Sequence, residues 1–237
     1  LARDNEAAIL LGLGRTMFAA PQRVTVEPQS AVVEVADLNQ DGYDDLAAIG
    51  QTTDALAVLL GNGDGTFQPK QLTATGDIPV GMAVGDLTGE GIPDVVVAND
   101  GSQNATVLVG VGDGTFQPAP SLPVGRGPGG VVFGDFNGDD VPDVLVSNGF
   151  DSTLSLFVGH GDGTFDAPQL VPLAILFPRP MAVSDFNEDG RADVAVGGLS
   201  SDRVAVLLGN GDATFQQLQT LSRGIGPIAL GTGDLNQ

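Results

Sequence analysis

Acidic and amide side chains stand at alternate positions near the start of the stretch DLNQDGYDDLAAIG, which runs from Asp37 to Gly50. A glycine follows them and the chain then becomes apolar, as expected for a loop that leads into a buried strand. A hard cation such as Ca²⁺ takes about six to eight oxygen ligands, which alternating carboxylates can supply. We therefore predict a Ca²⁺ site between two strands, with a sharp turn at Gly42 and ligands from Asp37, Asn39, Asp41, the backbone carbonyl of Tyr43, and Asp45.

The same loop recurs along the chain with nearly constant spacing. It begins again at Asp86, Asp135, Asp185 and Asp234, at steps of 49, 49, 50 and 49 residues. The three further complete loops offer ligands at the same five positions, the fourth of which contributes its backbone carbonyl: Asp86, Thr88, Glu90, Ile92 and Asp94; Asp135, Asn137, Asp139, Val141 and Asp143; and Asp185, Asn187, Asp189, Arg191 and Asp193.

The loops differ in how well they match this pattern. In the second loop, Thr88 offers a hydroxyl, which is a weaker ligand, and the longer Glu90 side chain shifts the geometry, so we expect the weakest binding there. In the third loop, Asp140 stands where glycine is preferred, but aspartate tolerates the left-handed backbone conformation. The fifth loop stops after Asp234 and Asn236, and two ligands are too few to hold an ion.

The alternative is that these residues only form turns, which Asp, Asn and Gly favour without any ion. Several carboxylates within one short loop repel each other, however, and a bound cation offsets that repulsion. Ca²⁺ is favoured over Mg²⁺, because Mg²⁺ retains its waters and requires stricter octahedral geometry.

A second motif keeps the same period and defines the elements around the loops. It reads GLGRTMF, GNGDGTF, GVGDGTF, GHGDGTF and GNGDATF, ending at Phe18, Phe67, Phe116, Phe165 and Phe215. Within the first complete repeat, alternation predicts strands over residues 31–36, 46–49, 56–60 and 67–75, and no helical period appears. Four antiparallel strands per repeat are typical of an all-β β-propeller, with a linear β-solenoid as the alternative.

The repeat also predicts how the chain is organised. We expect one propeller domain over residues 1–237, with a partial blade at 1–28, four full blades at 29–77, 78–127, 128–177 and 178–226, and a partial blade at 227–237. The two ends together nearly complete one more blade. Either a depleted blade closes a five-bladed ring, or the chain is a segment of a longer array, which a start at Leu1 rather than Met favours.

These loops and hairpins carry a family resemblance over essentially the whole chain. With VVFGDFNGDD at residues 131–140 and GNGDGTF at 61–67, the chain resembles the FG-GAP (VCBS-like) repeats of integrin α-subunit propellers and bacterial surface proteins. The resemblance implies a calcium-stabilised, extracellular or cell-surface propeller that acts in adhesion or ligand binding, sometimes attached to an enzyme. The predicted ligands correspond to the family's metal positions, except at Thr88, Glu90 and Asp140. Integrin propellers have seven blades, so the full protein is expected to be longer.

Composition narrows the partners. Nine Lys and Arg against 30 Asp and Glu give a formal charge of −21, which repels nucleic acid and anionic lipid headgroups. Apolar runs are short and broken by Gly and Pro, so no membrane insertion is expected. The chain has no cysteine, which excludes disulfides and thiolate metal sites.

Three functions remain to be compared. A non-catalytic scaffold would bind a protein or another polymer across one propeller face, and a lectin-like module would bind a glycan. Aromatic rings commonly contact sugars, but the chain has no Trp and a single Tyr, and most Phe recur with the repeat, which predicts inter-blade core for Phe67, Phe116 and Phe165. Phe150 and Phe177 lie off the repeat, where we expect satellite core positions rather than surface contacts.

An enzyme is disfavoured, although an accessory domain of a secreted enzyme remains an alternative. The single histidine, His160, occupies a variable hairpin position and is expected to be a solvated turn residue rather than a general base. The linkers after the second strand of each repeat vary, which suits either a binding surface or tolerant turns; they cover residues 51–54, 99–104, 148–152 and 199–202.

Overall fold

The computed structural model describes residues 5–14, 17–222, 227 and 229–233, and within these residues every regular element is a β-strand. The all-β prediction is confirmed. Four consecutive antiparallel sheets follow one another along the chain, and each begins with its innermost strand and ends with its outermost strand.

Each sheet corresponds to one repeat. The first contains β5 (Ser30–Ala36), β6 (Asp45–Gly50), β7 (Ala55–Leu59) and β8 (Gln71–Ala74). The second contains β9 (Pro79–Gly85), β10 (Asp94–Asn99), β11 (Asn104–Gly110) and β12 (Phe116–Pro118), and β13 (Leu122–Pro123) also pairs with β11. The third contains β14 (Pro128–Gly134), β15 (Asp143–Asn148), β16 (Thr153–Phe157) and β17 (Gln169–Pro172). The fourth contains β18 (Pro178–Ser184), β19 (Asp193–Gly198), β20 (Arg203–Gly209) and β21 (Phe215–Ser222).

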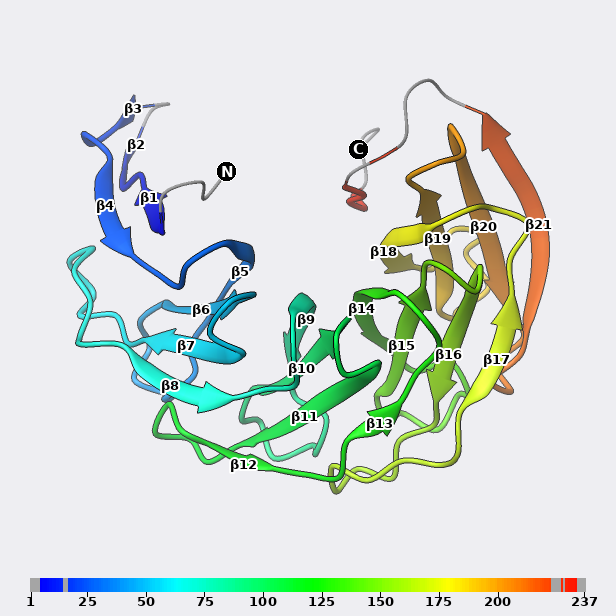
Figure 1. Cartoon of the computed structure of the whole chain (residues 1–237), viewed down its shortest axis with the longest axis horizontal. Helices are drawn as coiled ribbons and strands as arrows, with labels where there is room; N and C mark the ends of the chain where they lie inside the picture. Colours follow the sequence, from blue (N-terminus) through cyan, green and yellow to red (C-terminus); the bar gives the residue numbers. More distant parts are fainter. Residues whose placement is uncertain (1–4, 15–16, 223–226, 228, 234–237) are drawn as a thin grey trace.

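Two smaller pairs precede these sheets. β1 (Glu6–Ile9) pairs with β4 (Gln22–Thr25), and β2 (Gly12–Gly14) pairs with β3 (Met17–Phe18). Figure 1 shows the sheets side by side along an open arc, with the N-terminal strands and the fourth sheet on either side of the opening. β5, β9, β14 and β18 lie along the inside of the arc, and neighbouring members of this set are in contact.

Alternation along the strands explains the packing between sheets. Every residue of β10 is buried, but consecutive side chains point to opposite faces. Val95 and Val97 pack in a core shared with the first sheet, whereas Val96 and Ala98 pack in a core shared with the third. The predicted core positions of Phe67, Phe116 and Phe165 are confirmed, because each packs against one of these inter-sheet clusters.

Glycines let the innermost strands approach each other closely. A Cβ at Gly81 would lie 1.7 Å from the carbonyl oxygen of Gly129, and a Cβ at Gly130 would lie 2.0 Å from that of Arg179. The pairing register shifts at this end of β9, β14 and β18. Side chains at these points would force neighbouring blades apart.

The strands predicted for the first repeat agree with β5, β6 and β7 to within one residue at each end. The predicted fourth strand is too long, because β8 covers only Gln71–Ala74 and Phe67 forms an isolated bridge with Gly61. Pro69 lies between the bridge and β8 and lacks the N–H group that a continuous ladder needs. In the described part of the chain, no helix is long and apolar enough to cross a membrane.

Candidate metal-binding loops

The four acidic loops join the innermost strand of each sheet to the second strand, and their first aspartates organise them. The Asp37 carboxylate accepts hydrogen bonds from the backbone N–H groups of Asp41 (3.1 Å) and Gly42 (2.8 Å). Asp135 accepts from Gly138, Asp139 and Asp140 at 2.7 to 3.2 Å. The aspartate that opens each loop therefore folds the turn around its own carboxylate, as an Asx-turn does.

In three of the four loops, the side chains of the third and fifth residues, counted from the first aspartate, are also hydrogen-bonded to each other. The amide Nδ2 of Asn39 donates to Oδ2 of Asp41 at 2.9 Å, and the Asn137–Asp139 and Asn187–Asp189 pairs do the same at 2.8 and 3.0 Å. The other oxygen of the fifth-position aspartate accepts the backbone N–H of Tyr43, Val141 or Arg191. These loops bring their first three predicted ligands into one hydrogen-bonded turn.

The second loop is built differently. Asp86 accepts hydrogen bonds from the backbone N–H groups of Gly89 and Gly91, both at 2.7 Å, and the Thr88 hydroxyl lies 3.5 Å from Asp86 Oδ1. Glu90 is exposed. The loop therefore has the same organising first aspartate, but Thr88 and Glu90 do not form the pair that Asn and Asp form in the other three loops.

The last predicted ligand of each loop has a structural role that the sequence pattern did not reveal. Asp143 is completely buried, and its two oxygens accept the backbone N–H groups of Phe136 (2.9 Å) and Gly159 (3.0 Å). Asp45, Asp94 and Asp193 make the equivalent pair of hydrogen bonds, at 2.7 to 2.8 Å. Each of these aspartates therefore ties its loop to the hairpin 16 residues further along the chain.

A glycine at each hairpin makes this contact possible. A Cβ at Gly61, Gly110, Gly159 or Gly209 would lie 2.3 Å from the carbonyl oxygen of the residue that precedes the buried aspartate. The fixed offset between that aspartate and that glycine is the sequence signal that could have identified the contact.

Burial disfavours the charged form of three of these aspartates. Loss of solvent raises the pKa of the Asp45, Asp94 and Asp143 carboxyls above the usual aspartate value, although the backbone N–H donors partly oppose the shift. Nearby acids raise the pKa further: Asp41 and Asp37 act on Asp45, and Asp139 and Asp135 act on Asp143. The predicted ligands of one loop are thus close enough to repel each other.

The donor chemistry fits a hard cation, because it combines carboxylate and amide oxygens with a backbone carbonyl. In the residues that the structure describes, no group of three or more Asp, Glu, His or Cys side chains converges in a metal-binding arrangement. The Asn amide nitrogens instead lie against the acids, so cation binding would require each amide to present its oxygen. The fifth loop, at Asp234 and Asn236, which we expect to hold no ion, lies outside the described residues.

Comparison with known families identifies the repeat that contains this loop. The family model of the FG-GAP-like repeat matches residues 37–97, 86–146, 142–196 and 185–237, which is most of the chain. The chain belongs to the FG-GAP-like repeat family. A search of curated proteins finds no match.

Solved structures resemble the FG-GAP chain in fold. A protein from Lactobacillus plantarum superposes with a TM-score of 0.73 at 16% identity, covering 95% of this chain and 67% of the other. The Pseudomonas aeruginosa periplasmic gluconolactonase superposes with a TM-score of 0.70 at 18% sequence identity, covering 93% of this chain and 64% of the gluconolactonase. An Agrocybe aegerita lectin that recognises non-reducing terminal N-acetylglucosamine superposes with a TM-score of 0.64 at 23% sequence identity, covering 92% of this chain and 61% of the lectin. The chain spans 60% to 61% of the length of the first three solved structures that it matches.

The hairpins of the FG-GAP repeats lie at the same end of the blades as the acidic loops. Oδ1 of Asp64 accepts both the backbone N–H (2.9 Å) and the hydroxyl (2.6 Å) of Thr66, and Asp113, Asp162 and Asp212 repeat this arrangement. Asn62 donates to the hydroxyl of Thr66, and Asn210 donates to the equivalent hydroxyl of Thr214. His160 takes their place, with Nδ1 3.0 Å from Thr164 Oγ1 and Nε2 3.2 Å from Asp166 Oδ1. His160 therefore occupies the turn position expected for it.

The hairpin aspartates predict a small pH dependence of stability. The Thr115 hydroxyl and backbone N–H lower the pKa of the Asp113 carboxyl, so the charged form stabilises the fold above the unfolded-state pKa, and this contribution is lost as pH falls through the lowered pKa. We expect Asp113→Asn to lower the urea midpoint at about pH 6 and to have no effect near pH 2. An equal difference at both pH values would contradict this assignment.

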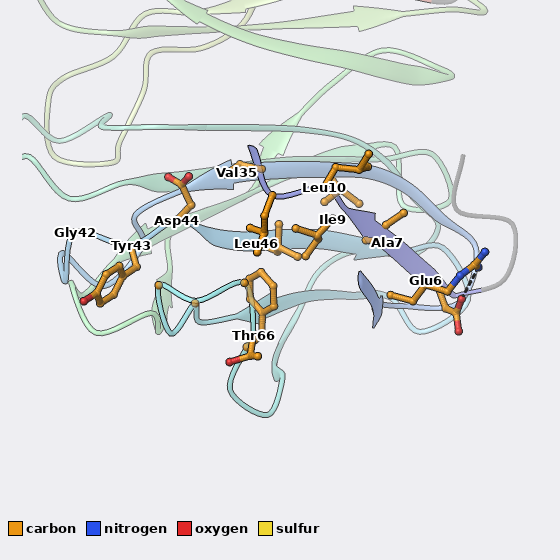
Figure 2. A pocket seen from close by; sticks show the side chains of 18 residues that line it. Glu6, Ala7, Ile9, Leu10, Val35, Gly42, Tyr43, Asp44, Leu46 and Thr66 are labelled. Carbon is orange, nitrogen blue, oxygen red and sulfur yellow. Dashed lines mark hydrogen bonds and ion pairs between the residues drawn. The ribbon is translucent and has the colours of Figure 1, made fainter. Parts of the chain in front are cut away.

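A cavity of about 900 Å³ lies between the N-terminal strands and the first sheet of the FG-GAP chain (Figure 2). Ala7, Ile9, Val35 and Leu46 line it, and Glu6 forms an ion pair with Arg23 at its edge. The β1–β4 pair corresponds to the two outer strands of a complete blade, β7 and β8 in the first sheet. In the described residues, no strand pairs with the other edge of β1, where β6 pairs with β7 in the first sheet. The cavity thus marks the place of the two inner strands found in each complete blade.

The two phenylalanines outside the repeat correct an expectation. Phe150 is 63% exposed and Phe177 is 40% exposed, so neither is a satellite core residue. Both lie at the end of the blades opposite the acidic loops, where the linkers between second and third strands are found. Their packing depends on neighbouring blades, which the repeat pattern of a single blade does not describe.

Proposed function

We propose that this FG-GAP chain is a calcium-binding, non-catalytic propeller scaffold of an extracellular protein, and that it presents a ligand surface on one face. The observation that supports the proposal most directly is the arrangement of the first, third and fourth loops. In each of them, two aspartates and an asparagine share one hydrogen-bonded turn, and a buried aspartate lies at the turn's end.

In the first loop, Asp37, Asn39, Asp41 and the Tyr43 carbonyl would hold the ion. Asp45 can join them, because each of its oxygens has a second lone pair besides the one that accepts a backbone N–H. A bound Ca²⁺ supplies positive charge that offsets the repulsion between the carboxylates and joins the end of β5 to the start of β6.

The contacts within the loops support an expected order of affinity. The third loop retains its full set of ligands, whereas the second has an exposed Glu90 and the weakly placed Thr88 hydroxyl. In the fourth loop, the Arg191 guanidinium lies 3.8 Å from Asp189 Oδ2 and would compete with the ion for that carboxylate. We therefore expect the first and third loops to bind most tightly and the second to bind most weakly.

Calcium should raise the thermal stability of the protein. A ligand that binds only the folded state adds about 2.7 kcal/mol per site at a concentration of 100 times its Kd. We expect the melting temperature of EDTA-treated protein to rise progressively with Ca²⁺, and much less with Mg²⁺. Differential scanning calorimetry across a titration of each ion measures this.

Matched variants localise the effect. Asp139→Asn, in the third loop, should reduce the calcium-dependent rise, whereas Asp113→Asn, on a hairpin outside the loops, should leave it unchanged. A melting temperature that does not respond to Ca²⁺ would refute the metal-binding part of the proposal.

A glycan is the second candidate ligand, and the exposed Phe150–Phe177 pair favours it. The rings lie edge to face with centroids 5.5 Å apart, on a surface away from the acidic loops. Among the structural neighbours, one is a lectin and another is a lactonase, so an accessory role beside a secreted enzyme is compatible with the same fold. His160 is already engaged as a hairpin residue, which supports a non-catalytic role.

A further inference from the structure

Phe150 and Phe177 come from adjacent blades and meet at one point of the surface. Phe150 lies in the linker between β15 and β16, and Phe177 directly precedes β18. Their ring planes are inclined at 77°. At the positions of Phe150 in the other three linkers, the chain has Thr52, Gly101 and Ser200, so the ring is specific to this blade.

Neither burial nor backbone preference accounts for phenylalanine at position 177. The residue adopts a left-handed conformation, with φ of 51°, although 40% of it is exposed. The equivalent residue of the third blade is Gly127, with φ of 67°, which adopts this conformation without steric cost. The same left-handed conformation recurs at Gln29 and Ile78, so every blade adopts it at this position, and only the exposed aromatic ring is specific to Phe177.

A cavity of about 130 Å³ lies beside the two rings. Its walls include Leu199 and the backbone of Gly127 and Gly149, and its polar lining residues are Asp100 and Arg179. A Cβ at Gly127 would lie 2.4 Å from the Phe150 ring, so this glycine allows the ring to lie against the main chain. The cavity is much smaller than the roughly 300–1,000 Å³ of a typical ligand pocket, so it can take at most one small ring.

Arg179 gives the cavity a hydrogen-bond donor. Its side chain packs over Gly129, where a Cβ would lie 2.6 Å from the arginine Cγ. Within the described part of the chain, Arg179 takes part in none of the ion pairs, whereas Arg126 nearby pairs with Asp151 at 2.9 Å. Asp100 also lines the cavity and can offer a carboxylate acceptor, so the lining residues combine apolar ring surfaces with one donor and one acceptor.

We infer that this Phe150–Phe177 cavity binds one neutral sugar ring at the end of a glycan. The C–H faces of a sugar suit the phenylalanine rings, and its hydroxyls can donate to Asp100 and accept from Arg179. A purely apolar ligand would leave both polar groups desolvated without partners, which is costly. An anionic sugar would meet the Asp100 carboxylate and the −21 charge of the chain.

This inference specifies the ligand class of the glycan-binding candidate and rests on it, but it does not depend on calcium. Saturation-transfer NMR should be run with the methyl glycosides of glucose, galactose and mannose, with N-acetylglucosamine, and with glucuronate as the anionic comparison. Each is tested in Ca²⁺ and in EDTA. The calcium melt contains no sugar, so failure of either proposal is seen separately.

Phe177→Gly is the decisive variant, because glycine already occupies the equivalent position at Gly127 and should fold at least as well. We expect at least one neutral sugar to bind the unmodified protein, and Phe177→Gly and Phe150→Ala each to weaken that sugar about tenfold or more. The matched control is Ile78→Ala, at the equivalent left-handed position of the second blade, with φ of 55° and 48% exposure. Its affinity should be unchanged.

Three results would overturn the inference. They are the absence of saturation transfer to every neutral sugar, binding of glucuronate alone, and equal affinity in the unmodified protein and the two phenylalanine variants. The melting temperature of each variant shows whether it is folded under the conditions of the binding measurement.

Discussion

Asp143→Ala is expected to lower the free energy of unfolding by about 2–6 kcal/mol, because two buried backbone N–H groups lose their acceptor at about 1–3 kcal/mol each. The donors are Phe136 N–H and Gly159 N–H, and the aspartate itself is completely buried. Loss of this contact frees the acidic loop from the hairpin at the end of the third blade.

The structural role of Asp143 can be separated from its proposed role as a metal ligand. Urea denaturation in EDTA removes any contribution of calcium. Under these conditions Asp143→Asn should cost roughly half as much as Asp143→Ala, since an amide retains one acceptor oxygen but presents N–H groups to the second donor.

Asp139→Ala is the control, because Asp139 is an exposed member of the same loop and its hydrogen bonds to Val141 N–H and Asn137 are open to solvent. Its cost in EDTA should stay within about 1 kcal/mol. If Asp139→Ala and Asp143→Ala destabilise the calcium-free protein equally, the buried contact is not what holds the loop to the hairpin.

Gly130→Ala is expected to destabilise the protein by about 3 kcal/mol or more, since the added methyl would meet backbone rather than a movable side chain. The new Cβ would lie 2.0 Å from the carbonyl oxygen of Arg179, so β14 and β18 would have to separate. The core between the third and fourth sheets, which includes Leu145 and Val194, would lose part of its packing.

The effect of Gly130→Ala is steric, because Gly130 is not among the residues with positive φ. Gly12→Ala is the matched control: Gly12 also has no positive φ, and a Cβ added there would have no atom within 4 Å. Urea midpoints of both variants measure the difference. A Gly130→Ala midpoint close to that of Gly12→Ala would mean that the innermost strands can move apart at little cost.

The sequence alone determined the strands, the turns and the repeat, because each depends on residues close together in the chain. Alternation in stretches such as residues 46–49 depends on the pleat of one strand, and the DLNQDG turn depends on side chains that hydrogen-bond to nearby backbone groups. Both signals can therefore be recognised from a few consecutive residues. Repetition of these signals at a nearly constant period then predicted the blades and the all-β propeller, which the structure and the family match confirm.

Contacts between distant residues were decided only by the tertiary structure. Asp45 reads as a loop ligand, but strand pairing places Gly61 N–H on its carboxylate and buries both. Phe136 and Phe186 occupy equivalent loop positions, yet Phe136 is 1% exposed and packs against Phe215 of the next sheet, whereas Phe186 is 42% exposed. Phe150 and Phe177 meet because two blades lie side by side. Burial depends on which neighbour covers a residue, and that neighbour is chosen by the assembly of the sheets rather than by the residue's own repeat.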